Sequence, residues 1–206
     1  MPAFDRDAVD RHDVDFMLVQ NSFVVLFWRV AILKKRIAWL RDHGYHVVSL
    51  DASMWTADAD LHRDIAKALS FPDYYGCNLD ALHDCLGQIA HNDIEFSPKA
   101  VGLVLVLTGY DSFARHCPYA AQAVLDSFAI QARLAALIGH RMICLVQSNN
   151  PDICFESVGA TPVVWNDAEW LDANRRPPRK PKRKRPTAHK IASSPRGTAR
   201  PTKRRQ

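Results

Sequence analysis

The 206-residue sequence lacks the short motifs that identify the common enzyme classes. It contains no Gly-x-Ser-x-Gly, no Gly-x-x-x-x-Gly-Lys-Ser/Thr, no Gly-x-Gly-x-x-Gly and no His-Glu-x-x-His. It therefore offers no nucleophile elbow, phosphate loop, dinucleotide fingerprint or zinc-protease helix. The clusters His43-Gly44-Tyr45-His46 and His116-Cys117 have no spacing that catalysis demands. We expect a protein that is not an enzyme and that uses no cofactor.

Cysteines are few and long apolar runs are missing. The five cysteines are odd in number and form no Cys-x-x-Cys pair, which argues against a disulfide framework or a zinc site. They are Cys77, Cys85, Cys117, Cys144 and Cys154. The acidic start of the chain is unlike a basic secretory leader, so we expect a reduced, cytoplasmic setting. The run Phe23–Trp28 is far shorter than the roughly 20 apolar residues of a membrane helix, and we expect no membrane partner.

Acidic residues are absent from the last part of the chain. Residues 175–206 carry 14 Lys or Arg, which leaves 13 of the 27 basic residues and all 22 acidic ones in residues 1–174, a net charge of −9. The basic segment is rich in Pro and poor in apolar side chains, so we predict a disordered tail that holds nucleic acid non-specifically. Alternatively, it could aid solubility or self-association, or fold back over the acidic body. That body favours fast capture of a basic protein.

Apolar periodicity predicts an α/β fold with a small parallel sheet. Three buried-type strands are expected, Val47–Leu50, Val101–Leu107 and Met142–Val146. Helical segments separate them, as in a sheet with right-handed crossovers. The predicted helices cover residues 31–43, 60–69, 79–89 and 119–138, with one further short element at 163–171. Two apolar runs, Val14–Val19 and Phe23–Trp28, flank Gln20-Asn21-Ser22 and predict a hairpin.

The helix predicted after Asn78 has an apolar side and an acidic side. Asn78 itself is a typical helix N-cap. At about 100° per residue, Asp80 and Asp84 lie roughly opposite a stripe formed by Leu79, Leu82, Leu86 and Ile89. Two like charges at this spacing repel by roughly 0.2–0.5 kcal/mol, so folding gains little from the pair. The two carboxylates are either a solvated face or a contact for an Arg- or Lys-rich partner site.

The residues around this helix resemble a known family of inhibitors. Tyr74-Tyr75-Gly76, Asn78-Leu79-Asp80-Ala81-Leu82 and Asp84-Cys85-Leu86 closely resemble the recognition segment of the barstar family, the intracellular protein inhibitors of secreted ribonucleases. The resemblance implies a barstar-like domain over residues 47–174, with a three-stranded parallel sheet packed with helices. Residues 1–46 would then be an N-terminal extension, a hairpin plus helix packed on the core, and residues 175–206 the tail.

The resemblance also implies a partner and roles for single residues. Asp84 would enter the active site of a basic secreted or toxin-type ribonuclease in place of a substrate phosphate, with Asp80 as a second charged contact. The positions that match the family's binding surface are Tyr74, Gly76, Asn78 and Leu79. His83 stands where the family often has Trp, and Ile130 lies in a region where the founding member has an acid. The target is therefore a different ribonuclease or a related toxin.

Each of these residues also has a purely structural interpretation. Tyr74 or Tyr75 could pack in the loop, Asn78 could act only as a cap, and Gly76 could supply a positive φ. Leu79 could belong to the core and His83 could be an ordinary surface residue. Our main prediction is a cytoplasmic barstar-like ribonuclease inhibitor, an immunity protein. The alternative is a nucleic-acid-associated protein whose basic tail supplies affinity while the domain docks another protein. A third, less favoured interpretation is a catalyst on the same fold.

Overall fold

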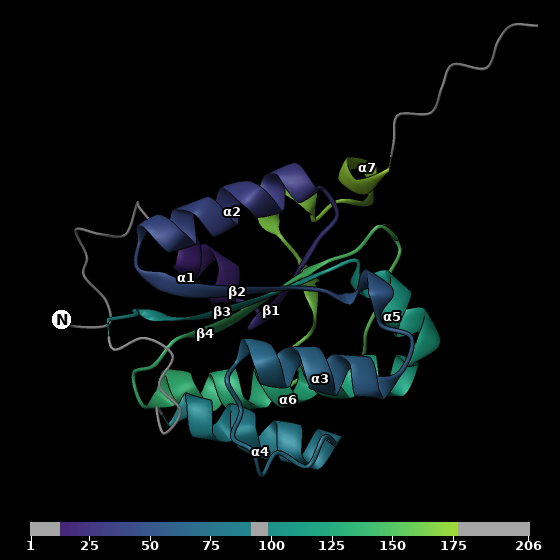
Figure 1. The fold of residues 1–206 in the computed structure, drawn as a ribbon. Coiled ribbons are helices and arrows are strands. Elements are labelled where there is room, and N and C mark those ends of the chain that lie inside the picture. Colours follow the sequence, from purple (N-terminus) through teal and green to yellow (C-terminus); the bar gives the residue numbers. More distant parts are fainter. Residues whose placement is uncertain (1–12, 92–98, 177–206) are drawn as a thin grey trace, which may run out of the picture.

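A parallel five-stranded sheet forms the middle layer of the protein in the computed structural model, which describes residues 13–91 and 99–176 (Figure 1). The strands are β1 (Val24–Phe27), β2 (Tyr45–Asp51), β3 (Gly102–Thr108), β4 (Met142–Gln147) and β5 (Val164–Trp165). They are arranged in the order β2-β3-β4-β1-β5, and each pair of neighbours is parallel. The α/β class and the parallel sheet predicted from the sequence are confirmed.

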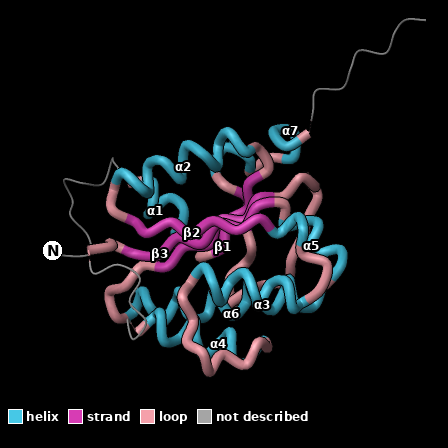
Figure 2. The backbone as a smooth tube through the Cα atoms, in the orientation of Figure 1, coloured by secondary structure: helices cyan, strands magenta, loops and turns pink. Residues whose placement is uncertain are grey.

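Helices cover both faces of this sheet (Figure 2). On one face lie α1 (Val14–Val19) and α2 (Val30–Asp42). On the other lie α3 (Asp58–Ala68), α4 (Leu79–Ala90), α5 (Tyr110–His116) and α6 (Pro118–Leu137). The shorter elements are the 3₁₀ turns η2 (Ala52–Met54) and η3 (Asp167–Glu169) and the helix α7 (Asp172–Arg175). None of the helices in the described ranges is long and apolar enough to span a membrane.

The aliphatic run of β3 explains why helices cover both faces of the sheet. Leu103, Leu105 and Leu107 belong to the core formed with α3 to α6. Val104 and Val106 alternate with them and pack in the second core, against α1 and α2. Side chains of a strand alternate between the two faces, so a continuous aliphatic run is typical of a strand that is buried on both sides. The prediction of a central parallel strand at this position is confirmed.

The predicted N-terminal hairpin is wrong. Val14–Val19 forms a helix instead of a strand, and Val24–Phe27 pairs in parallel with β4, Val24 opposite Cys144. β1 also pairs with β5 on its other edge, so the sheet has two strands more than the three predicted. The physical reason is that the backbone of a short apolar run can form hydrogen bonds with any strand that tertiary packing places beside it. A partner more than 100 residues away leaves no trace in the local pattern.

Glu169 fastens the C-terminal segment to the end of β1. Its buried carboxylate accepts hydrogen bonds from the Trp28 N–H and the Arg29 N–H, each at 2.9 Å, and from the Arg29 guanidinium. Burial alone would raise the pKa of Glu169, but these donors hold it below its usual value. The predicted boundary at residue 46 falls inside β2. The separate roles of residues 1–46 and 47–174 stay a prediction, and residues 177–206 of the predicted tail lie outside the described ranges.

Candidate partner-binding site

Asn78 starts the helix that carries the acidic pair. Its Oδ1 accepts a hydrogen bond from the Ala81 N–H at 2.8 Å, which satisfies one of the free donors in the first turn of α4. Its Nδ2 donates to the Gly76 carbonyl at 3.3 Å, so the same side chain also holds the preceding loop. The predicted cap is confirmed. The two bonds fix the direction in which the chain enters α4.

Gly76 leaves room for this amide. A Cβ at Gly76 would come within 3.1 Å of Asn78 Nδ2 and 3.6 Å of the Ala81 Cβ. The suggestion that Gly76 supplies a positive φ is wrong, because the left-handed residue of the turn is Cys77, with a φ of 49°. A side chain at position 76 would therefore require the Asn78 amide to shift by a few tenths of an ångström. The backbone strain lies one residue later.

The two sides of α4 are oriented as its periodicity predicts. Leu82, Leu86 and Ile89 are buried together with Cys85, whereas Asp80 and Asp84 are exposed. Leu79 is half-buried at the edge of the core, so it belongs in part to the packing. The four steps from Asp80 to Asp84 advance by about 6 Å along the helix, which places the carboxylates one turn apart on the same side. Their role in binding a partner stays a prediction.

The two tyrosines of the loop have different environments. Tyr74 is 72% exposed, and its hydroxyl donates to Gln88 Oε1 at 3.1 Å on the same side of α4. Tyr75 is half-buried, packs edge-on against Phe71 with ring centroids 4.9 Å apart, and contacts His62 Nδ1 through its hydroxyl at 2.5 Å. Tyr75 therefore anchors the loop, while Tyr74 is available to a partner.

The Tyr75–His62 hydrogen bond joins two neutral groups. Burial raises the pKa of the Tyr75 phenol, with a smaller contribution from Cys77. Burial also lowers the pKa of His62, against a smaller opposing effect of Asp58. A protonated phenol and an uncharged imidazole together favour Tyr75 as the donor and His62 Nδ1 as the acceptor. The loop is thus tied to α3 by a bond that depends on an uncharged His62.

His83 is more than an ordinary surface residue. It is half-buried, and its Nε2 lies 2.8 Å from Nε2 of Gln131, a buried residue of α6. The other end of that amide, Gln131 Oε1, is buried and has no hydrogen-bond partner. The amide lies over Gly87, where a Cβ would sit 3.4 Å from it. This contact joins α4 to α6 directly beside Asp84.

Gln131 was missed by the sequence reasoning, although a signal was present. Val124, Phe128 and Ala135 follow one another at helical spacing and are all buried, and Gln131 is the polar residue within that stripe. A polar side chain inside an apolar stripe needs a partner, and here the partner is on the acidic helix. The neighbouring Ile130 is 39% exposed, and the acid one turn before it, Asp126, accepts a hydrogen bond from the Gly159 N–H.

The site as a whole is chemically suited to contact with positively charged side chains. It presents two exposed carboxylates and one exposed aromatic ring on a capped helix, with the leucine side buried. Carboxylates of this kind make strong charge-assisted hydrogen bonds with Arg and Lys. Within residues 13–91 and 99–176, no group of three or more His, Cys, Asp or Glu side chains is placed to hold a metal ion.

Comparison with known proteins supports the resemblance seen in the sequence. The "Putative ribonuclease inhibitor YrdF" of Bacillus subtilis (strain 168) is 69% identical over 26 residues, which are 13% of this chain and 29% of the length of that protein. A family model described as Barstar (barnase inhibitor) matches residues 45–147. This range is half of the chain and runs from the start of β2 to the end of β4, with the loop 71–78 and α4 inside it. The protein therefore belongs to the Barstar family.

Proposed function

We propose that the protein inhibits a ribonuclease by placing Asp80 and Asp84 in the phosphate-binding site of the enzyme. The observation that carries this proposal is the acidic side of α4, where both carboxylates are exposed and point away from the leucine side. Membership of the Barstar family and the name of the Bacillus relative support the same class of partner. An inhibitor of this kind acts by occupying the active site and needs no catalytic group of its own.

The geometry supports this proposal because the acidic side is held rigid before binding. The Asn78 cap fixes the start of α4, and buried Leu82 and Leu86 fix its rotation against the core. A preorganised helix loses little conformational entropy when it binds. A ribonuclease active site must be basic to hold RNA phosphates, so two carboxylates one turn apart are complementary to it. The exposed ring of Tyr74 adds contact area with few rotatable bonds.

Inhibition of RNA cleavage by single variants tests the proposal. The wild-type protein, Asp84→Ala and Asp80→Ala are titrated against a basic secreted ribonuclease, with Asp42→Ala as a control. Asp42 is an exposed acid at the end of α2, on the other side of the sheet. We expect Asp84→Ala to raise the inhibition constant by about 30-fold or more, the effect of losing a binding hot spot. Equal inhibition by wild type and Asp84→Ala would contradict the mechanism.

The basic tail favours a second function, association with nucleic acid. Of its 14 Lys and Arg, Arg175 is buried and Arg176 contacts Asp152, which leaves 12 in residues 177–206. A segment with this charge binds RNA or DNA without sequence preference, and salt weakens the binding steeply. If the tail has this function, we expect immobilised RNA to retain the full chain at low salt. The retention should be lost at 0.5 M NaCl and on deletion of residues 177–206.

A further inference from the structure

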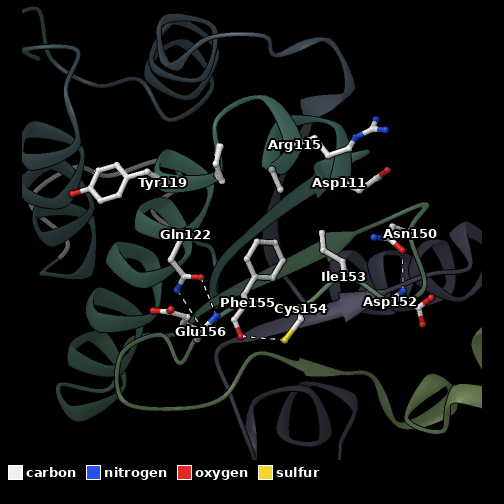
Figure 3. Close-up of a pocket in the computed structure, with 12 residues that line it drawn as sticks. Asp111, Arg115, Tyr119, Gln122, Asn150, Asp152, Ile153, Cys154, Phe155 and Glu156 are labelled. Carbon is white, nitrogen blue, oxygen red and sulfur yellow. Dashed lines mark hydrogen bonds between the residues drawn. The ribbon is translucent and has the colours of Figure 1, made fainter.

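A groove lies between α5, the first turn of α6 and the segment that follows β4 (Figure 3). Its volume is about 630 Å³. Its lining includes the apolar residues Ala114, Pro118, Ile153 and Phe155. The lining also includes three acidic residues, Asp111, Asp152 and Glu156, against one basic residue, Arg115. The groove is therefore both apolar and acidic, a combination suited to the long side chains of Lys and Arg.

Hydrogen bonds hold the walls of this groove in place. Gln122 joins α6 to the backbone of Glu156, as acceptor from its N–H at 3.0 Å and as donor to its carbonyl at 3.4 Å. The Asn149 N–H donates to Asp111 Oδ1 at 2.8 Å and connects α5 to the end of β4. Phe155 packs on Tyr110 with ring centroids 5.9 Å apart. The acidic groove is thus a fixed feature of the described structure.

The basic end of the chain leaves the described structure at the rim of this groove. Arg175 is only 6% exposed, lies over the Trp165 ring at 4.5 Å, and donates to the Pro151 carbonyl at 3.1 Å. The next residue, Arg176, donates to Asp152 Oδ1 at 3.2 Å. One basic residue of this segment thus already contacts a carboxylate of the groove.

We propose that residues 177–185, Pro-Pro-Arg-Lys-Pro-Lys-Arg-Lys-Arg, occupy this groove of their own chain. Extended chain advances about 3.3 Å per residue, so Lys180 reaches up to about 13 Å from Arg176. Glu156 and Tyr119 lie at the end of the groove away from Asp152 (Figure 3). Tyr119 is 79% exposed and offers a ring face to a cation. Because the segment is tethered at Arg175, its effective concentration at the groove is high even though each contact is weak.

The groove is a better place for the tail than the acidic side of α4. α7, from which the tail begins, lies on the side of α2, whereas α4 lies beyond α3 and α6 on the opposite side of the sheet (Figure 1). In contrast, one lining residue of the groove, Asp152, already contacts Arg176. The proposed docking therefore leaves Asp80 and Asp84 uncovered. It also withdraws part of the basic segment from nucleic acid.

Zero-length cross-linking of the full chain tests the docking. Equal amounts of ¹⁴N- and ¹⁵N-labelled protein are mixed at low salt and treated with a carbodiimide, which joins an amine directly to a carboxylate. We expect mass spectrometry to find links from Lys180, Lys182 or Lys184 to Asp111, Asp152 or Glu156, each within one isotopic form. Lys34 on α2, which is exposed, serves as the internal reference and should not link to these carboxylates.

A charge-matched pair of variants separates docking from general attraction. Asp152→Asn/Glu156→Gln should lower the remaining links to Asp111 by about five-fold, the combined effect of two exposed ion pairs. Asp42→Asn/Asp73→Asn removes the same charge at exposed positions outside the groove and should leave the yield unchanged. Three results would each overturn the proposal. The first is that the tail lysines link to Asp80 or Asp84 and not to the groove, and the second is that the links join the two isotopic forms. The third is that the yield of links at low salt is no higher than in 0.5 M NaCl.

Discussion

Asn78 links the recognition loop to α4 through one side chain, so its removal should act on both. Asn78→Ala loses the hydrogen bond to the Ala81 N–H and the bond to the Gly76 carbonyl. We expect the free energy of unfolding to fall by about 0.5–2 kcal/mol, measured by urea denaturation. Asn78→Asp keeps the acceptor for the cap and should retain most of the stability. If the alanine variant were as stable as wild type, the cap would have no energetic role.

His62 makes the anchoring of Tyr75 sensitive to pH. Because burial lowers the pKa of His62 in the folded protein, the unfolded chain, with a pKa of about 6.5, takes up the proton first as the pH falls. The contribution of His62 to stability is therefore complete above about pH 6.5 and is lost as the pH falls through the folded pKa. Wild type should lose more unfolding free energy between pH 7.5 and 5.5 than His62→Asn, in which residue 62 no longer titrates. Identical losses in the two proteins would contradict this account.

β1 is the element whose importance the sequence conceals. Leu26 is fully buried and lies in the core between β4 and β5. We expect Leu26→Ala to lower the free energy of unfolding by about 2–5 kcal/mol, the cost of a large-to-small change in a core. Val30→Ala, at an exposed position in the first turn of α2, should change it by less than about 1 kcal/mol. A small effect of Leu26→Ala would contradict the contribution of β1 to the stability of the core.

The contact between α4 and α6 has a predictable energetic signature. Gln131 has one amide atom bonded to His83 and the other, Oε1, buried without a partner. Gln131→Leu removes both amide atoms, and the leucine fills most of the space that the glutamine occupied. We expect the free energy of unfolding to stay within about 1 kcal/mol of wild type or to rise, because a buried unsatisfied acceptor is costly.

Ribonuclease inhibition by Gln131→Leu should weaken if Gln131 orients His83 on the binding side. His83→Gln shows whether the imidazole itself matters.

Elements with local signals could be predicted, and those that depend on distant partners could not. The Asn78 cap and the leucine spacing predict the helix from Leu79, and the aliphatic run predicts β3. Each of these features lies within about a dozen consecutive residues. The apolar run of β1 predicted a strand, but its parallel partner could not be assigned, since the pairing of Val24 with Cys144 spans 120 positions of the chain. Val14–Val19 was predicted as a strand and forms α1 instead. The His83–Gln131 contact could not be predicted either, because it also joins residues that are far apart in the sequence. The exposed acidic pair, its Asn78 cap and its leucine side were foreseen, whereas the support from Gln131 on α6 was not.

At the scale of the whole molecule, charge is divided along the sequence, and this division predicts how salt affects inhibition. The chain has a net charge of +5, but residues 1–174 carry −9 and the basic segment begins after α7, across the sheet from α4 (Figure 1). If the tail stays near α7 and the groove beside it, the field near Asp80 and Asp84 is negative. A basic ribonuclease is then attracted, although the chain as a whole is positive.

Association with the ribonuclease should therefore become faster as salt is removed. At 0.1 M ionic strength charges interact over about 10 Å and at 1 M over about 3 Å, so screening removes the attraction between surfaces before contact. We expect the association rate measured by stopped flow to rise about ten-fold or more from 0.5 M to 0.05 M NaCl. Asp84→Ala should act mainly on dissociation, because it loses a buried contact. A tail that covered α4 would reverse the first result: the positive charge would repel the enzyme, and lowering the salt would slow association.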